Sequence, residues 1–117
     1  MRNQPKYNLF KNSKYALDGL KSAIKNETSF KLELFFAIFI LLGIWLVEVP
    51  LSSKLILLIS GVLVLIVELI NSAIENVVDL HTKEFHILAK NAKDIGSAAV
   101  MLSIILHLVC WFFILVF

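Results

Sequence analysis

Four polar residues interrupt an apolar stretch near the middle of the chain. In the segment "VELINSAIENVVD", residues 67–79, the four that share one helical spacing are Glu68, Asn71, Glu75 and Asp79. At about 100° per residue, a helix places all four on one stripe about 80° wide and about three turns long. An ionised group inside a membrane span costs several kcal/mol unless it is paired or faces a polar cavity. Three acids on one stripe cannot all pair with each other, so cations are needed to offset their negative charge.

A further acid stands on an apolar face upstream. Residues 9–27 have the pattern of an amphipathic helix with a basic polar face, which is typical of a helix on a membrane surface, and Glu27 falls within its apolar stripe. Magnesium commonly takes one or two carboxylates and leaves positions for phosphate oxygens, so Glu27 together with a carboxylate of the stripe suits such a site. Lys93 could supply a charge for phosphate. Together these residues indicate phosphoryl transfer from a soluble nucleotide to a molecule in the membrane.

The elements that position these residues are predicted to be membrane helices. The chain is 59% hydrophobic, whereas a soluble domain is about 45–50% apolar. A span needs about 20 mostly apolar residues; the last of three apolar runs reaches that length alone, and the first two reach it when their polar ends are included. We expect an all-α integral membrane domain over residues 1–117, with a surface helix at about 9–27 and spans at about 30–49, 53–78 and 95–117. Cap- and turn-favouring residues in "NETS", residues 26–29, predict a bend between the surface helix and the first span.

The distribution of Lys and Arg predicts the orientation. Seven basic residues lie in residues 1–33, one lies in the first connection, three lie near the second connection, and the C-terminal tail has none. They are, in chain order, Arg2, Lys6, Lys11, Lys14, Lys21, Lys25 and Lys31, then Lys54, then Lys83, Lys90 and Lys93. The excess of Lys and Arg belongs on the cytoplasmic side. We therefore expect a cytoplasmic N-terminus and second connection, which three spans satisfy.

Several segments together resemble the small prokaryotic diacylglycerol kinase family. They are "VELINSAIENVVD", "AKNAKDIGSAAV" and the upstream "YALDGLKSAIKNETSFKLE", and the resemblance runs from about residue 9 to 111. It implies an ATP- and magnesium-dependent lipid kinase that phosphorylates diacylglycerol to phosphatidic acid at the cytoplasmic face. It also implies a homotrimer with active sites between subunits, in the bacterial inner membrane, with no nucleic-acid partner.

The resemblance also implies roles for individual residues. Glu68 matches the general base, Asn71 a residue near the transferred phosphoryl group, and Glu27 and Glu75 the magnesium ligands. The nucleotide contacts are matched by Tyr15, Glu27, Glu75, Glu84, His86, Leu88, Lys93 and Asp94. The positions lining the lipid site are matched by Lys21, Glu33, Glu68, Ser97 and Trp111. One position that is usually basic in the family is Asn8 here, and we expect Lys6 or Lys11 to take over its nucleotide contact.

Two alternatives remain open from the sequence. One is an undecaprenol kinase, a branch of the same family that acts on a polyprenol; "IGSAAV" and Trp111 favour the glycerolipid branch. The other is a non-enzymatic channel or assembly protein that uses the acidic stripe for ions or partners, which the "AKNAKDIGSAAV" segment disfavours. Among the histidines, we expect His107, in the third span, to be a packing or hydrogen-bonded residue. His81 and His86 are expected to be solvated or to contact nucleotide.

Overall fold

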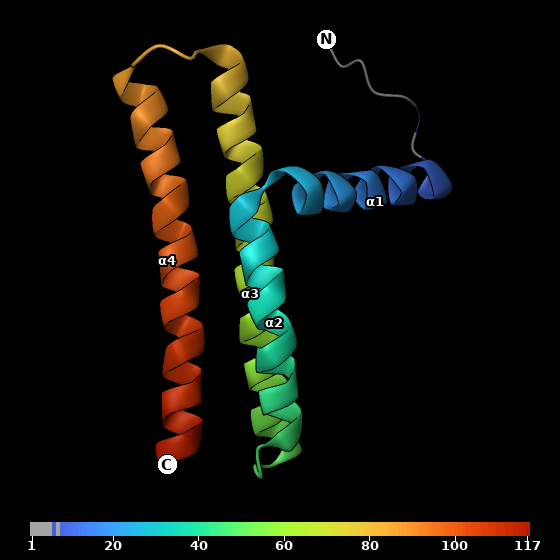
Figure 1. The fold of residues 1–117 in the computed structure, drawn as a ribbon, viewed down its shortest axis with the longest axis vertical. Coiled ribbons are helices and arrows are strands. Elements are labelled where there is room, and N and C mark those ends of the chain that lie inside the picture. The colour runs from blue at the N-terminus through green and yellow to red at the C-terminus, as the bar shows by residue number, and fades with distance from the viewer. Residues whose placement is uncertain (1–5, 7) are drawn as a thin grey trace.

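The computed structural model describes residues 6 and 8–117, and this part of the chain contains four helices and no strand. They are α1 (Leu9–Asn26), α2 (Thr28–Leu46), α3 (Leu51–His81) and α4 (Ile87–Val116). Helices α2, α3 and α4 run along the long axis of the molecule, and α1 projects sideways from them (Figure 1). Each of α2, α3 and α4 is long and apolar enough to cross a membrane. The prediction of an all-α membrane protein with one surface helix and three spans is confirmed.

The three long helices differ in length. With 19 residues, α2 is about 28 Å long and matches the roughly 30 Å hydrocarbon layer. With 31 and 30 residues, α3 and α4 exceed that thickness by about 15 Å. Their upper ends extend past the level at which α1 joins α2 (Figure 1). The polar end of α3, with Glu75 and Asp79, therefore lies on an extension beyond the membrane core.

A single residue separates the surface helix from the first span. Glu27 has an extended backbone, φ −103° and ψ 104°, and ends α1 by donating its N–H to the Ala23 carbonyl. The predicted bend at residues 26–29 is therefore present. At the other end of α1, the Asn8 side chain accepts hydrogen bonds from the N–H groups of Phe10, at 3.0 Å, and Lys11, at 3.2 Å. Asn8 is thus the N-cap of the helix, a role that its residue type favours.

The helix limits differ from the limits of the predicted spans at two places. We expected the first span to run to about residue 49, but α2 ends at Leu46. We expected the last span to begin near residue 95, whereas α4 begins at Ile87, because the His86 ring accepts from the Leu88 N–H at 3.1 Å and caps it. The polar residues 87–94 contain no Gly or Pro, so nothing interrupts a capped helix there. The second connection is consequently reduced to residues 82–86.

The interior of the bundle is largely polar. The buried apolar residues are Ala23, Phe30, Ile44 and Leu57, whereas the buried polar ones are Ser60, Glu68, Asn71, Ser72, Ser103 and His107. Most large apolar side chains of α2, α3 and α4 point outward. Small and polar residues are typical of helix contacts inside membranes, where lipid covers the apolar faces. Helices α3 and α4 make the most extensive contact, and it includes Ser60 against His107 and Asn71 against Gly96.

Cysteine labelling tests the predicted topology. In a Cys110→Ala background, Ser52→Cys would place a thiol in the outer turn and Lys83→Cys one in the second connection, and both positions are exposed. We expect a membrane-impermeant maleimide to label Ser52→Cys in intact cells and Lys83→Cys only after lysis. Labelling of both from one side would contradict three spans, and the reverse pattern would contradict a cytoplasmic N-terminus.

Candidate functional site

Four carboxylates from three parts of the chain approach one another. Glu68 on α3 is only 5% exposed, and it is near enough to Glu75, Glu27 and Glu33 for their charges to act on it. Glu27 comes from the bend between α1 and α2, and Glu33 from α2. Neither ion pair in the described residues involves any of the four. The fold thus gathers negative charge beside the buried polar stripe, which suits a bound cation.

The amide of Asn71 lies inside this cluster. Its Nδ2 donates to Glu75 Oε1 at 3.2 Å, but its buried Oδ1 has no hydrogen-bond partner among the described residues. Gly96 of α4 faces that oxygen, and a Cβ on residue 96 would overlap it. Gly96 therefore lets the α4 backbone approach α3 at the site. The sequence assigned Gly96 no role, although a glycine inside a helical motif indicates close packing.

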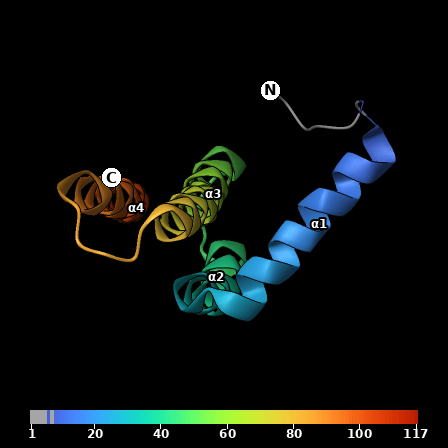
Figure 2. The same ribbon diagram turned by 90° about the horizontal axis from the view of Figure 1, so that it is seen from above.

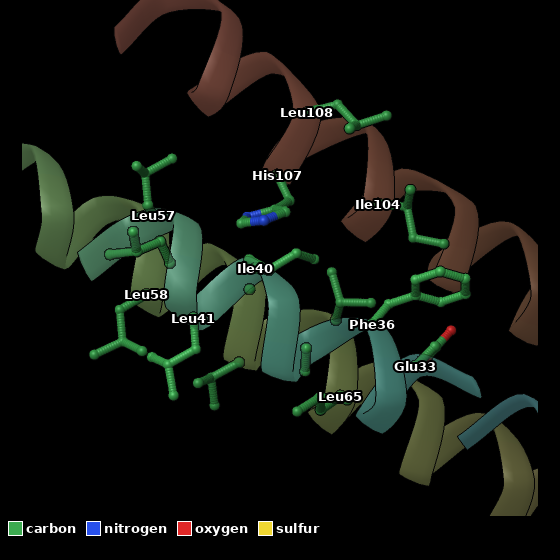
Figure 3. Close-up of a pocket in the computed structure, with 15 residues that line it drawn as sticks. Glu33, Phe36, Ile40, Leu41, Leu57, Leu58, Leu65, Ile104, His107 and Leu108 are labelled. Carbon is green, nitrogen blue, oxygen red and sulfur yellow. The ribbon is translucent and has the colours of Figure 1, made fainter. Parts of the chain in front are cut away.

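An apolar groove runs along the bundle beside the cluster. It has a volume of about 400 Å³ and is lined by residues of α2, α3 and α4. Figure 3 shows Glu33 at one end, with the side chains of Phe36 and Ile40 following along α2. The Glu33 Oε2 is buried without a partner in the described part of the chain. Because an unpaired buried oxygen is costly, the groove suits a hydrocarbon chain that carries a hydrogen-bond donor near Glu33.

A second depression, of about 380 Å³, lies at the connection between α3 and α4. Its lining includes the predicted nucleotide residues Glu84, His86, Lys93 and Asp94, but not Leu88, which is exposed elsewhere. Lys93 pairs with Asp79, and Lys90 with Asp94, each at 2.5 Å. All four of these side chains are about half exposed. The depression is therefore charged, open and able to hold a phosphorylated solute.

Other predicted residues stand apart within one subunit. Tyr15 and Lys21 are exposed on α1, which extends away from α4 on the far side of α3 (Figure 2). Ser97 is exposed on α4, and Trp111 lies fourteen residues further along that helix, about 21 Å away. One subunit therefore does not bring Tyr15 to the depression, nor Ser97 to Trp111.

Comparison with known proteins places this site in a family. A family model described as prokaryotic diacylglycerol kinase matches residues 14–115. The chain belongs to the prokaryotic diacylglycerol kinase family. A diacylglycerol kinase of Haemophilus influenzae is 47% identical over 111 residues, covering 93% of this chain and 92% of that protein. The diacylglycerol kinase of Escherichia coli K12 is 39% identical, with coverages of 88% and 84%, and one from Helicobacter pylori is 42% identical, with coverages of 88% and 80%.

Membership of the diacylglycerol kinase family confirms the resemblance predicted from the sequence. The match covers almost the whole chain, and it includes the acidic stripe and the "AKNAKDIGSAAV" segment. The chain is accordingly an enzyme of a lipid kinase family, built of membrane-spanning helices.

Replacement of Gly96 tests the contact between α4 and Asn71. In Gly96→Ala the new methyl group would push Asn71 away from Glu75, so we expect kcat to fall at least about tenfold, a barrier increase of about 1.4 kcal/mol. Gly19→Ala is the matched control, because a Cβ there meets no atom within 4 Å. Both changes raise helix propensity by about 1 kcal/mol, so loss of folding is not the expected cause. Equal kinase rates for the two variants would contradict the role of Gly96.

Proposed function

We propose that this protein transfers the γ-phosphoryl group of ATP to the hydroxyl of diacylglycerol and forms phosphatidic acid at the cytoplasmic face of the inner membrane. The observation that carries the proposal is the buried Glu68, which lies between an apolar groove ending at Glu33 and the polar extension of α3. A lipid alcohol in the groove would meet a carboxylate there. The diacylglycerol kinases to which the chain is similar supply the substrate class.

Glu68 is the proposed general base. The hydroxyl oxygen of the lipid attacks the γ-phosphorus and forms a new P–O bond. The bond between the γ-phosphorus and the bridging oxygen breaks, and ADP leaves with that oxygen. The hydroxyl proton passes to the Glu68 carboxylate, which must lie within hydrogen-bond reach of the hydroxyl. Asn71 has a buried Oδ1 with no partner among the described residues and lies one turn along α3, so its amide can orient the reacting groups.

Magnesium fits the residues present. No group of three His, Cys, Asp or Glu ready for a metal ion exists within residues 6 and 8–117, but magnesium on a nucleotide often takes only one or two carboxylates. Glu27 and Glu75 would hold the ion, and the negative charge gathered around Glu68 supports a cation there. When bound, the ion would offset negative charge on the transferring phosphates. The two carboxylates would thereby set the position of the nucleotide phosphates relative to the hydroxyl of the lipid.

The depression at residues 78–94 is the proposed nucleotide site. The Lys93 ammonium group, which pairs with Asp79, could pair with a phosphate of the nucleotide instead. Glu84 and His86 lie on the connection that closes the depression, and Asp94 is held by Lys90. Tyr15 is too far away in the same subunit to take part.

A homotrimer would complete the site. Helix α1, with Tyr15 and Lys21, points away from the depression of its own subunit (Figure 2). A neighbouring subunit could place its α1 against that depression, and Ser97, exposed on α4, would then face the partner. The large apolar faces left uncovered in one subunit are consistent with both lipid and subunit contacts.

A comparison of acceptors tests the proposed function. The purified protein in lipid bicelles would be given labelled ATP, magnesium and either diacylglycerol or undecaprenol. We expect phosphorylation of diacylglycerol with a kcat/KM at least about tenfold higher. Preference for undecaprenol would assign the chain to the polyprenol branch. Absence of ATP turnover with any lipid alcohol would support a channel or assembly protein instead.

Glu68→Gln tests the general base. The amide keeps the shape of the side chain but cannot take a proton, and general bases typically contribute about 10²–10⁴-fold. We expect kcat to fall at least about a hundredfold, while nucleotide binding, measured by equilibrium dialysis, changes little. Near-normal turnover, or a loss caused only by failed ATP binding, would exclude Glu68 as the base.

Glu75→Gln tests the magnesium site. Removal of one ligand should nearly abolish turnover at ordinary magnesium concentration and raise the concentration needed for half-maximal rate. The protein should stay folded, and its thermal stability should not decrease, since one repelling charge is lost. Glu48→Gln, at an exposed acid of the outer turn, is the control and should retain the magnesium dependence of the wild type. An unchanged magnesium dependence in Glu75→Gln would rule out this ligand.

A further inference from the structure

A hydrogen-bonded chain of three side chains joins α3 to α4 at the end of the groove remote from Glu33. Ser60 Oγ lies 2.8 Å from His107 Nδ1, and Trp111 Nε1 lies 3.0 Å from His107 Nε2. Ser60 Oγ is also 3.1 Å from the Leu57 carbonyl oxygen. Ser60 and His107 are each only 5% exposed. The proposed phosphoryl transfer uses neither of them.

The direction of these hydrogen bonds follows from the chemistry of the groups. The indole N–H of Trp111 can only donate, so His107 Nε2 must accept and the ring is neutral. The proton of the imidazole is therefore on Nδ1 and is donated to Ser60 Oγ, whose own hydroxyl donates to the Leu57 carbonyl. Every donor and acceptor in the chain is satisfied. His107 consequently cannot activate Ser60 as a nucleophile, and the chain serves to hold side chains in place.

Two glycines lie beside the aromatic side chains, and the one at Gly61 makes room for the ring. A Cβ on Gly61 of α3 would lie 3.2 Å from His107 Cε1, so the absence of a side chain lets the imidazole pack against that helix. A Cβ on Gly43 of α2 would lie 3.8 Å from Trp111 Cη2, so the indole reaches from α4 to α2. Figure 3 shows the His107 ring between α3 and α4 in the wall of the groove. Trp111 is not among the residues that line the groove; it lies three residues beyond Leu108, the lining residue of α4 farthest along the chain, so the indole stands just past this end of the groove.

We propose that His107, which lines this end of the groove, is a positioning residue that locks the Trp111 indole just beyond it and so sets how well the end of the acceptor's hydrocarbon chain is bound. The proposal rests on the proposed lipid kinase function. Lipid alone cannot orient an indole, whereas two hydrogen bonds in series fix its rotamer from α3. Because His107 acts on binding of the chain and lies remote from the phosphoryl group, its effect is on the KM for the acceptor and not on kcat.

His107→Phe, which retains an aromatic ring but forms neither hydrogen bond, tests the proposal. A net hydrogen bond corresponds to about a three- to tenfold change in affinity, so we expect the KM for diacylglycerol to rise by about that factor. The KM for ATP should not change, and kcat should stay within about twofold. Ser60→Ala should move the acceptor KM in the same direction. Ser103→Ala is its matched control, because Ser103 is equally buried and its Oγ donates only to the Val100 carbonyl.

A double substitution and a spectroscopic measurement separate positioning from general stabilisation. In a Trp111→Phe background, His107→Phe should cause no further rise in acceptor KM, because no indole is left to position. In a Trp45→Phe background, Trp111 is the only tryptophan, and His107→Phe should shift its emission and increase its quenching by acrylamide. If His107→Phe folds poorly, Ser60→Ala leaves the His107 ring in place and can be measured for both the acceptor KM and the Trp111 fluorescence.

The outcomes distinguish this proposal from the proposed function. A wild-type protein that phosphorylates no lipid alcohol would overturn the proposed function and, with it, the effect on the acceptor. An active wild type whose acceptor KM and Trp111 emission are unmoved by His107→Phe would overturn the positioning role alone. Additive effects of His107→Phe and Trp111→Phe on the acceptor KM would also overturn it.

Discussion

The inability of hydrocarbon to solvate a carboxylate governs this structure. Glu68 and Asn71 must turn away from lipid, and that requirement fixes the rotation of α3 about its axis. Once α3 is oriented, its opposite face is left to lipid, and its polar face must meet α2 and α4. Close approach of the helices at this contact needs small residues, and Gly61 of α3 and Gly96 of α4 supply them. The polar interior is thus a consequence of the solvent in which the helices lie.

Helix length then determines where the acidic residues lie relative to the membrane surface. Because α2 is one membrane thickness long and α3 is longer, the last turns of α3 extend beyond the surface at which α1 turns aside. The bend places Glu27 at this surface, at the same level as the inner part of the acidic stripe. A water-soluble nucleotide and a membrane-dissolved alcohol can meet only at such a boundary. The one-residue bend is therefore as important to the site as the stripe.

Periodicity and charge predicted the features that lie within single helices. The stripe of Glu68, Asn71 and Glu75, the bend near Glu27 and the three spans all follow from patterns along the chain. The polar residues of the second connection left the start of the last helix open, and the His86 cap decides it in the structure. The contacts of Gly96 with Asn71 and of Ser60 with His107 depend on the relative register of two helices, which no pattern within one helix encodes.

Satisfied and unsatisfied polar atoms divide the buried interior into two regions. Around His107 every donor and acceptor has a partner within the subunit, so that region can hold its geometry without a ligand. Nearer the surface helix, Glu33 Oε2 and Asn71 Oδ1 are buried with no partner in the described residues. Their desolvation is offset only when another molecule supplies donors or a cation. The free energy lost at these two oxygens on folding is therefore available to favour binding, and the proposed site puts the acceptor and the phosphoryl group there.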